Sequence, residues 1–141
     1  MGVIDIKNLF LCAWSKETCV PSQREEWSKD NPSLGQCAIT ALIINDIFGG
    51  KIMRCMSQSG SHYYNLINNN IVDFTVEQFL GVSPEYEHAE IRTREYLLSN
   101  EDTKKRYILL TKNLNQAIEK INGEIQIKQL KKSLNIKDFS E

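Results

Sequence analysis

The feature that most constrains the fold is a helical segment that is apolar over most of its surface. Residues 36–48 place Ala, Leu, Ile and Phe side chains on almost every side of a helix. A helix of this kind is buried against other elements on several sides. Gly49 and Gly50 follow, and glycine ends helices because it adopts the left-handed conformation without a Cβ clash. The sequence therefore predicts a central helix that other elements surround.

A cysteine stands at the beginning of this helix. The polar loop at 31–34 leads into Gly35-Gln36-Cys37, so Cys37 lies where a loop becomes a helix. The first amide groups of a helix have no partner within it, and the helix N-terminus carries about half a positive charge. Such a position stabilises a thiolate, which is the nucleophilic form of cysteine. We therefore interpret Cys37 as a candidate catalytic nucleophile.

The sequence after the central helix indicates strands joined by short turns. Three alternating segments are typical of strands: 51–56, 62–67 and 71–74. An Asn-rich tight turn at 68–70 joins the last two, because Asn tolerates left-handed backbone angles. Thr75, with Gln78 three residues later, matches a capping box that begins a short helix. We expect an α+β domain in which the Cys-bearing helix packs on a small antiparallel sheet of about three strands.

Helices are expected on both sides of this core. Apolar residues recur at helical spacing over residues 4–14 and again over 107–121. The polar segment between the first helix and the central helix reads as a long loop, and such loops are often functional. Since no internal repeat or low-complexity linker is visible, we predict a single domain over residues 1–122. Residues 123–141 would form a C-terminal helical appendage with one last short helix.

Composition restricts the classes of function. The chain has 141 residues, a net charge of −1 and 41% hydrophobic residues, which is ordinary for a globular domain. The charge balance makes a general nucleic-acid binder unlikely, although residues 100–141 are mildly basic. No apolar run approaches the ~18 residues of a membrane helix. The start of the chain does not match a secretory signal, so we expect a cytoplasmic protein whose four cysteines stay reduced.

A cysteine nucleophile needs a base, and histidine is the usual choice because its pKa lies near neutrality. The chain has two histidines. His88 lies in an acidic segment that we expect to be exposed. His62 begins the second predicted strand, directly after a small turn, so the sheet would hold it firmly at its edge, where a cleft could reach it. A lone strand histidine is more often structural, but its pairing with Cys37 favours His62 as the base.

The base in turn needs a group that fixes its tautomer. Asp73 is the candidate, because it stands between Val72 and Phe74 at a position otherwise reserved for apolar residues. If Asn68 and Asn69 form a two-residue loop, His62 and Asp73 share one face of the sheet as diagonal neighbours, about 7–8 Å apart at Cα. A three-residue loop would place them on opposite faces. The alternative role for Asp73 is a strand-end cap or a partner for a nearby arginine.

Acyl transfer also needs hydrogen-bond donors for the oxyanion that develops on the substrate carbonyl. The backbone N–H of Cys37 is one donor because it belongs to the attacking residue. A side-chain amide would supply the second, and Gln36 and Asn31 both lie just upstream. Anchoring of the loop is the alternative role for each of these two side chains.

These residues resemble the sites of known thiol enzymes. The order of a Cys, a His on a strand and an Asp on the next strand is similar to that of papain-like and transglutaminase-like enzymes. Gly35-Gln36-Cys37 resembles the Gly-Gln-Cys of transglutaminases. In papain-like peptidases the oxyanion amide lies six residues before the cysteine, and Asn31 has that spacing here. The resemblance implies a minimal papain-like core with a catalytic triad.

A closer resemblance is to the YunG-like family of small bacterial proteins, over roughly residues 4–112. The matching segments are Trp14-Ser15-Lys16-Glu17-Thr18, Asn31-Pro32-Ser33-Leu34-Gly35-Gln36-Cys37, Ser61-His62-Tyr63-Tyr64-Asn65, Val72-Asp73-Phe74-Thr75-Val76-Glu77-Gln78-Phe79 and Arg94-Glu95-Tyr96-Leu97-Leu98-Ser99-Asn100. This resemblance implies a fold and a site, and it does not name a substrate.

The leading functional expectation is a cysteine hydrolase or acyl transferase that acts on the amide bond of a protein, a peptide or a small molecule. Cys37 would attack the carbonyl, His62 would move the proton and Asp73 would hold His62. The alternative is a catalytically inactive papain-like module that binds a protein or peptide. A metal site made of the same three residues is the third interpretation, and it is disfavoured because soft metals prefer more Cys and His ligands. No metal or organic cofactor is implied, and the oligomeric state stays open.

Overall fold

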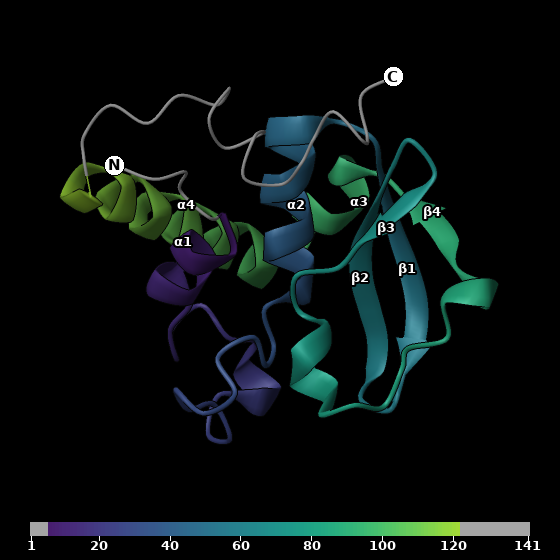
Figure 1. Cartoon of the computed structure of the whole chain (residues 1–141), viewed down its shortest axis with the longest axis horizontal. Helices are drawn as coiled ribbons and strands as arrows, with labels where there is room; N and C mark the ends of the chain where they lie inside the picture. The colour runs from purple at the N-terminus through teal and green to yellow at the C-terminus, as the bar shows by residue number, and fades with distance from the viewer. Residues whose placement is uncertain (1–5, 122–141) are drawn as a thin grey trace.

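A central helix, α2 (Cys37–Phe48), organises the computed structural model, which describes residues 6–121. It lies between the sheet on one side and the helices α1 (Ile6–Ala13) and α4 (Glu101–Ile121) on the other (Figure 1). Its residues from Ile39 to Ile44 are all buried. The prediction of a helix covered on several sides is therefore confirmed.

The sheet is antiparallel and has four strands in the order β3-β2-β1-β4. Their bounds are β1 (Lys51–Ser57), β2 (Gly60–Ile67), β3 (Asn70–Val72) and β4 (Glu90–Arg92). The α+β class is confirmed, but the expected count of about three strands misses β4. This strand is short and pairs with β1 at the sheet edge, and its side chains are not buried. Without a buried face it has no alternating pattern to recognise.

The β2–β3 hairpin has the register on which the position of Asp73 depends. Ile67 pairs with Asn70, and the two-residue loop between them is Asn68-Asn69. Both loop residues have positive φ, 49° and 67°, as a type I′ turn requires. The predicted register is therefore confirmed. Asp73 follows directly after the last residue of β3.

Shorter helical elements lie in the connections between these helices and strands. They are η1 (Pro21–Gln23), η2 (Val76–Phe79), η3 (Tyr86–His88) and α3 (Arg94–Leu98). Phe79 of η2 packs edge-on against His62, and Tyr86 of η3 packs in the same way against Tyr64, so these two segments cover part of β2. On another side of β2, the Asn65 Nδ2 donates a hydrogen bond of 3.0 Å to the Ala41 carbonyl of α2.

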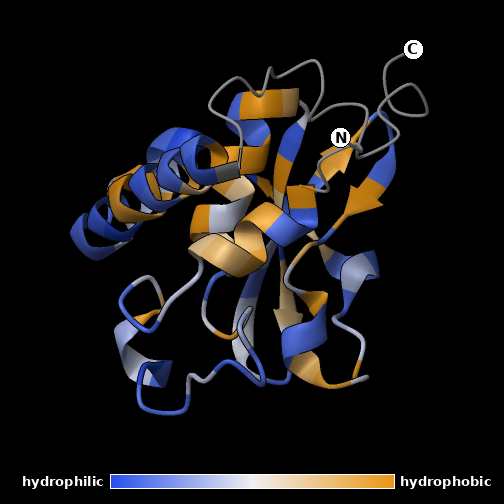
Figure 2. Ribbon diagram, turned by 60° about the vertical axis from the view of Figure 1, so that its left-hand side comes forward, coloured by the Kyte–Doolittle hydropathy of each residue, from blue (hydrophilic) through white to orange (hydrophobic). Residues whose placement is uncertain are grey.

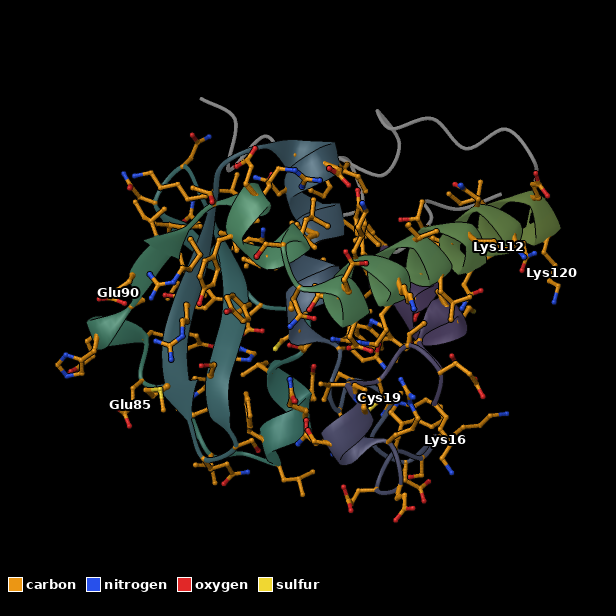
Figure 3. The ribbon with its side chains drawn as sticks, turned by 180° about the vertical axis from the view of Figure 1, so that it is seen from behind. Lys16, Cys19, Glu85, Glu90, Lys112 and Lys120 are labelled. Carbon is orange, nitrogen blue, oxygen red and sulfur yellow. The ribbon has the colours of Figure 1, made fainter. Side chains whose placement is uncertain are left out.

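The main hydrophobic core is formed by α1, α2 and α4 together with the end of the β2–β3 hairpin. Its largest buried side chains include Phe10, Ile39, Ile44 and Leu110. Figure 2 shows α4 with one hydrophobic side and one hydrophilic side, as expected of a helix that covers a core. In Figure 3 charged side chains such as Glu90, Lys112 and Lys120 point away from the protein.

The predicted appendage over residues 123–141, with its last short helix, lies outside the described residues. Of the predicted domain over residues 1–122, the structure describes residues 6–121, which form the fold given above. All four cysteines of the chain are free thiols. Between residues 6 and 121 no helix is both long enough and apolar enough to cross a membrane.

The close approach of the α2 C-terminus to β2 generates a stability prediction. Gly49 and Gly50 both have positive φ, but a Cβ on Gly50 would lie 2.6 Å from the Leu66 carbonyl oxygen, whereas a Cβ on Gly49 would meet nothing within 4 Å. Gly50→Ala should therefore lower the free energy of unfolding by roughly 1–3 kcal/mol more than Gly49→Ala. Urea unfolding of both variants measures the difference, and equal losses would contradict the predicted clash.

Candidate active site

Cys37 is the first residue of α2 and is partly exposed. Gln36 precedes it with φ −108° and ψ 3°, and no side chain caps this end of the helix. The amides of the first turn therefore donate no hydrogen bond to a capping side chain, and they favour a negative charge at Cys37. Cys19 and Cys55 are buried, and burial raises the pKa of both thiols to about 11.

Gly35 lies in the loop that precedes Cys37 and α2, and its backbone conformation sets the path of this loop. It has a φ of +72°, and a Cβ at this position would lie 2.5 Å from the Cys19 sulfur. Its carbonyl accepts a hydrogen bond of 3.0 Å from the Val20 amide. Only glycine fits such a position, because it combines a positive φ with a close neighbour.

His62 lies on β2, an inner strand, and its side chain is completely buried. Its Nε2 lies 2.7 Å from the Asp73 Oδ2. The other ring nitrogen, Nδ1, is buried without a hydrogen-bond partner in the described part of the chain. Because an ionised carboxylate only accepts hydrogen bonds, Nε2 carries a proton and Nδ1 is left for Cys37.

The charge of His62 depends on opposing effects. Burial disfavours the charged ring, whereas the hydrogen bond to Asp73 and the interaction with Cys37 favour it, and together they raise the pKa of His62 to about 9. The imidazolium is therefore the main form near neutral pH. A positive charge beside Cys37 stabilises the thiolate.

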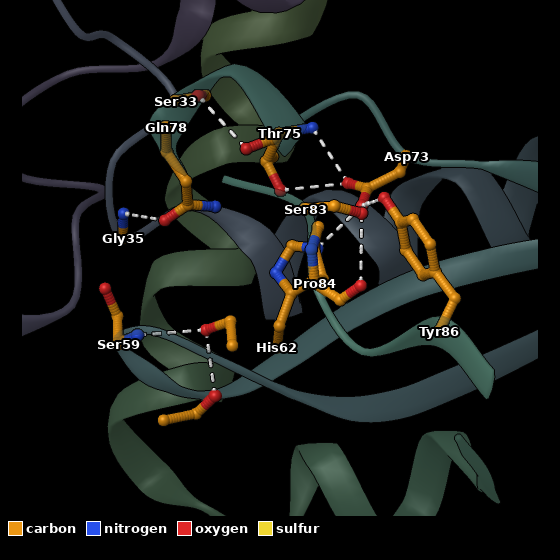
Figure 4. A network of polar contacts seen from close by, with 12 residues as sticks. Ser33, Gly35, Ser59, His62, Asp73, Thr75, Gln78, Ser83, Pro84 and Tyr86 are labelled. Atoms are coloured by element: carbon orange, nitrogen blue, oxygen red, sulfur yellow. Dashed lines mark hydrogen bonds and ion pairs between the residues drawn. The ribbon is translucent and has the colours of Figure 1, made fainter. Parts of the chain in front are cut away.

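Asp73 is held by more groups than the sequence indicated. Its Oδ1 accepts hydrogen bonds from the Thr75 amide at 3.2 Å and the Thr75 hydroxyl at 3.4 Å. The Tyr86 hydroxyl donates to its Oδ2 at 2.6 Å, beside the bond to His62 (Figure 4). Burial and this carboxylate raise the pKa of Tyr86, so its hydroxyl remains a donor. Sequence reasoning missed Tyr86, whose acidic neighbourhood gave no signal of a buried hydroxyl.

The structure does not bring the two predicted oxyanion side chains into the pocket that contains Cys37. The Asn31 Nδ2 donates to the Gln78 carbonyl at 3.3 Å, and the Gln36 Nε2 donates to the Ser15 carbonyl at 3.0 Å. Neither residue lines that pocket. Both amides thus make the loop-anchoring contacts that were the alternative interpretation. His88 is exposed, as expected, beside Glu87.

Gln78 lies in the pocket instead. The sequence assigned it to a capping box with Thr75, but the Thr75 side chain makes no cap. The Gln78 Oε1 accepts a hydrogen bond of 3.3 Å from the Gly35 amide, two residues before Cys37. Its Nε2 is buried and has no partner among the described residues. The sequence pattern around Thr75 predicted a local helix cap, whereas the Gln78 side chain contacts the loop before α2.

The pocket at Cys37 and His62 has a volume of ≈ 310 Å³, and Asp73 does not line it. Cys37 from α2, His62 from β2, Gln78 from η2 and Arg106 from α4 all line it. No aspartate or glutamate of the described chain lines its wall. Two positive groups line it, the His62 imidazolium and the Arg106 guanidinium, and the latter is paired with Asp102 at 2.7 Å. Within residues 6–121 no three His, Cys, Asp or Glu side chains are grouped closely enough to hold a metal ion.

This arrangement has the parts of a nucleophilic site. A thiol lies at a helix N-terminus, a buried imidazole faces it, and a carboxylate fixes the tautomer of that imidazole. These are the groups that activate a cysteine for attack on a carbonyl carbon.

Comparisons with known proteins agree with the resemblance to the YunG-like family. The family model described as YunG protein matches residues 3–119. The "Uncharacterized protein YunG" of Bacillus subtilis (strain 168) is 37% identical over 98 residues, which cover 69% of this chain and 80% of that protein. No solved structure gives a significant match. The chain belongs to the YunG family.

Proposed function

We propose that this protein is a thiol hydrolase or acyl transferase that acts on an amide bond through Cys37, His62 and Asp73, in a papain-like arrangement. The observation that carries the proposal is the state of the His62 ring. Its Nε2 is bound to Asp73 at 2.7 Å, while Nδ1 is buried, has no hydrogen-bond partner in the described part of the chain and is available to Cys37. A structural histidine in a core would be expected to satisfy both ring nitrogens.

The first half of the reaction forms a thioester. The Cys37 thiolate attacks the carbonyl carbon, a C–S bond forms, and the π electrons of the C=O bond move to the oxygen. The Cys37 N–H donates to this oxyanion. When the tetrahedral intermediate collapses, the C–N bond breaks and the His62 imidazolium gives its proton to the leaving amine.

The second half releases the acyl group. His62 is now neutral and takes a proton from the attacking water or acceptor amine. The attack on the thioester carbon forms a C–O or a C–N bond. The C–S bond then breaks, and the thiolate and the imidazolium are restored. Water gives hydrolysis and an amine gives acyl transfer, so one site supports a peptidase, an amidase, a deamidase or a transferase.

The pocket lining favours some substrates over others. The His62 imidazolium and Arg106, which is also paired with Asp102, bring positive charge to the lining, several hydroxyl groups line it, and no carboxylate of the described chain does. We propose a protein, peptide or small-molecule amide that is neutral or negatively charged close to the reacting bond. The four free cysteines fit a reducing compartment, and we propose the cytoplasm.

The first prediction concerns the pH dependence of alkylation. Since the pKa of His62 is raised to about 9, its positive charge persists as the pH falls from 9 to 6. Because this charge favours the thiolate, Cys37 should react with iodoacetamide at pH 6 at least tenfold faster than Cys12. In His62→Ala the rate at pH 6 should fall by at least tenfold. Mass spectrometry assigns the label, and exposed Cys12 is the reference within the same chain.

Two outcomes would count against an enzyme. Labelling of Cys37 at pH 6 no faster than that of Cys12 would show an ordinary thiol. The inactive binding module would then be the better interpretation. An unchanged profile in His62→Ala would show that the imidazole does not activate the sulfur.

The second prediction compares Asp73 with a carboxylate that lies outside the site. Asp73→Asn removes the negative charge beside the His62 ring, so the imidazolium and the thiolate both become less favourable. Alkylation of Cys37 at pH 6 should slow by roughly tenfold. Asp46→Asn is the matched control, because Asp46 also accepts a hydrogen bond from a tyrosine, Tyr107, but lies outside this pocket. Equal effects of the two substitutions would contradict the role of Asp73.

A further inference from the structure

We propose that the side-chain amide of Gln78 is the second donor of the oxyanion hole, an inference that rests on the proposed thiol chemistry. Gln78 is 6% exposed and lines the pocket that contains Cys37 and His62. Its Nε2 is buried and donates to no group of the described residues. A donor without an acceptor inside a reactive pocket is available to an oxygen that the substrate brings.

The orientation of this amide follows from its neighbour. The Gly35 amide is a donor, so the atom of Gln78 that faces it at 3.3 Å must be the acceptor Oε1. Nε2 consequently points the other way. Figure 4 shows this nitrogen on the side of Gln78 that faces the His62 ring. The interaction that fixes the amide thus comes from the loop that carries Cys37.

Two further contacts hold Gln78 in place. The Asn31 Nδ2 donates to its backbone carbonyl at 3.3 Å. The next residue, Phe79, packs edge-on against the His62 ring, with 4.8 Å between the ring centroids. Gln78 is therefore tied to the loop before α2 and to the base. Asn31, which the sequence offered as an oxyanion donor, acts here as a positioning residue for Gln78.

A pair of reagents separates this role from thiolate formation. Iodoacetamide reacts by direct displacement: the C–S bond forms, the C–I bond breaks and iodide leaves without any oxyanion. p-Nitrophenyl acetate reacts through a tetrahedral oxyanion: the C–S bond forms, the carbonyl π electrons move to oxygen, and collapse expels p-nitrophenolate to leave an acetyl thioester. The ratio of the acylation rate to the alkylation rate at Cys37 therefore reports the oxyanion donors.

The experiment measures this ratio in the full chain and in Gln78→Met, which keeps the length of the side chain and removes the donor. Loss of an oxyanion donor typically slows acyl transfer by about 10²–10³. We expect the ratio to fall by at least tenfold. Gln58→Met is the matched control, because the Gln58 Nε2 already donates to the Phe79 carbonyl and Gln58 lies outside the pocket. The ratio of acylation to alkylation in Gln58→Met should stay within twofold of that in the parent chain.

Each outcome has a separate meaning. Suppose that parental Cys37 is activated and acylated, and that the ratio of acylation to alkylation in Gln78→Met stays within twofold of the parental ratio. This result would overturn the role of Gln78 and leave the thiol chemistry intact. A parental Cys37 that shows no activation toward iodoacetamide would overturn the proposed function and this inference together. Activation without any acylation would overturn the oxyanion hole. Unfolding curves of Gln78→Met verify the fold, and Gln78→Glu, which keeps an acceptor for Gly35, should also lower the ratio.

Discussion

The two-residue turn between β2 and β3 is the constraint on which the site depends. Asn68 and Asn69 adopt positive φ and set the pairing of Ile67 with Asn70. Because side chains alternate along a strand, a register shifted by one residue would turn Asp73 away from His62. The bond of 2.7 Å between these two side chains is thus a consequence of backbone conformations several residues away.

The second constraint is the burial of α2. A helix covered by the sheet on one side and by α1 and α4 on the other has a fixed position, so its first residue, Cys37, is fixed as well. The site that results contains a buried polar atom without a partner among the described residues. This atom is Gln78 Nε2, and such a group costs roughly 1–3 kcal/mol. Groups that lower stability in this way are common where they act on a substrate.

The sequence predicted the parts of this molecule that follow from strong local patterns. The apolar surface of α2 and the Asn turn at 68–69 are local signals, and with the scarcity of histidines they were enough to select Cys37, His62 and Asp73. Long-range contacts gave no such signal. Tyr86 reaches Asp73 across the sheet, and Gln78 has a local pattern that predicted a helix cap instead. The edge strand β4 lacks a buried face, so the rule that finds strands could not find it.

The central claim is that His62 is held as an imidazolium between Asp73 and Cys37. The most direct measurement is a titration of the ring nitrogens by ¹⁵N NMR, with the exposed His88 as the second signal in the same spectrum. If His62 is held in this way, both of its ring nitrogens are protonated at pH 7 and the ring loses its proton near pH 9. A ring that is neutral at pH 7 and titrates near ~6.5, as a free histidine does, would contradict the claim.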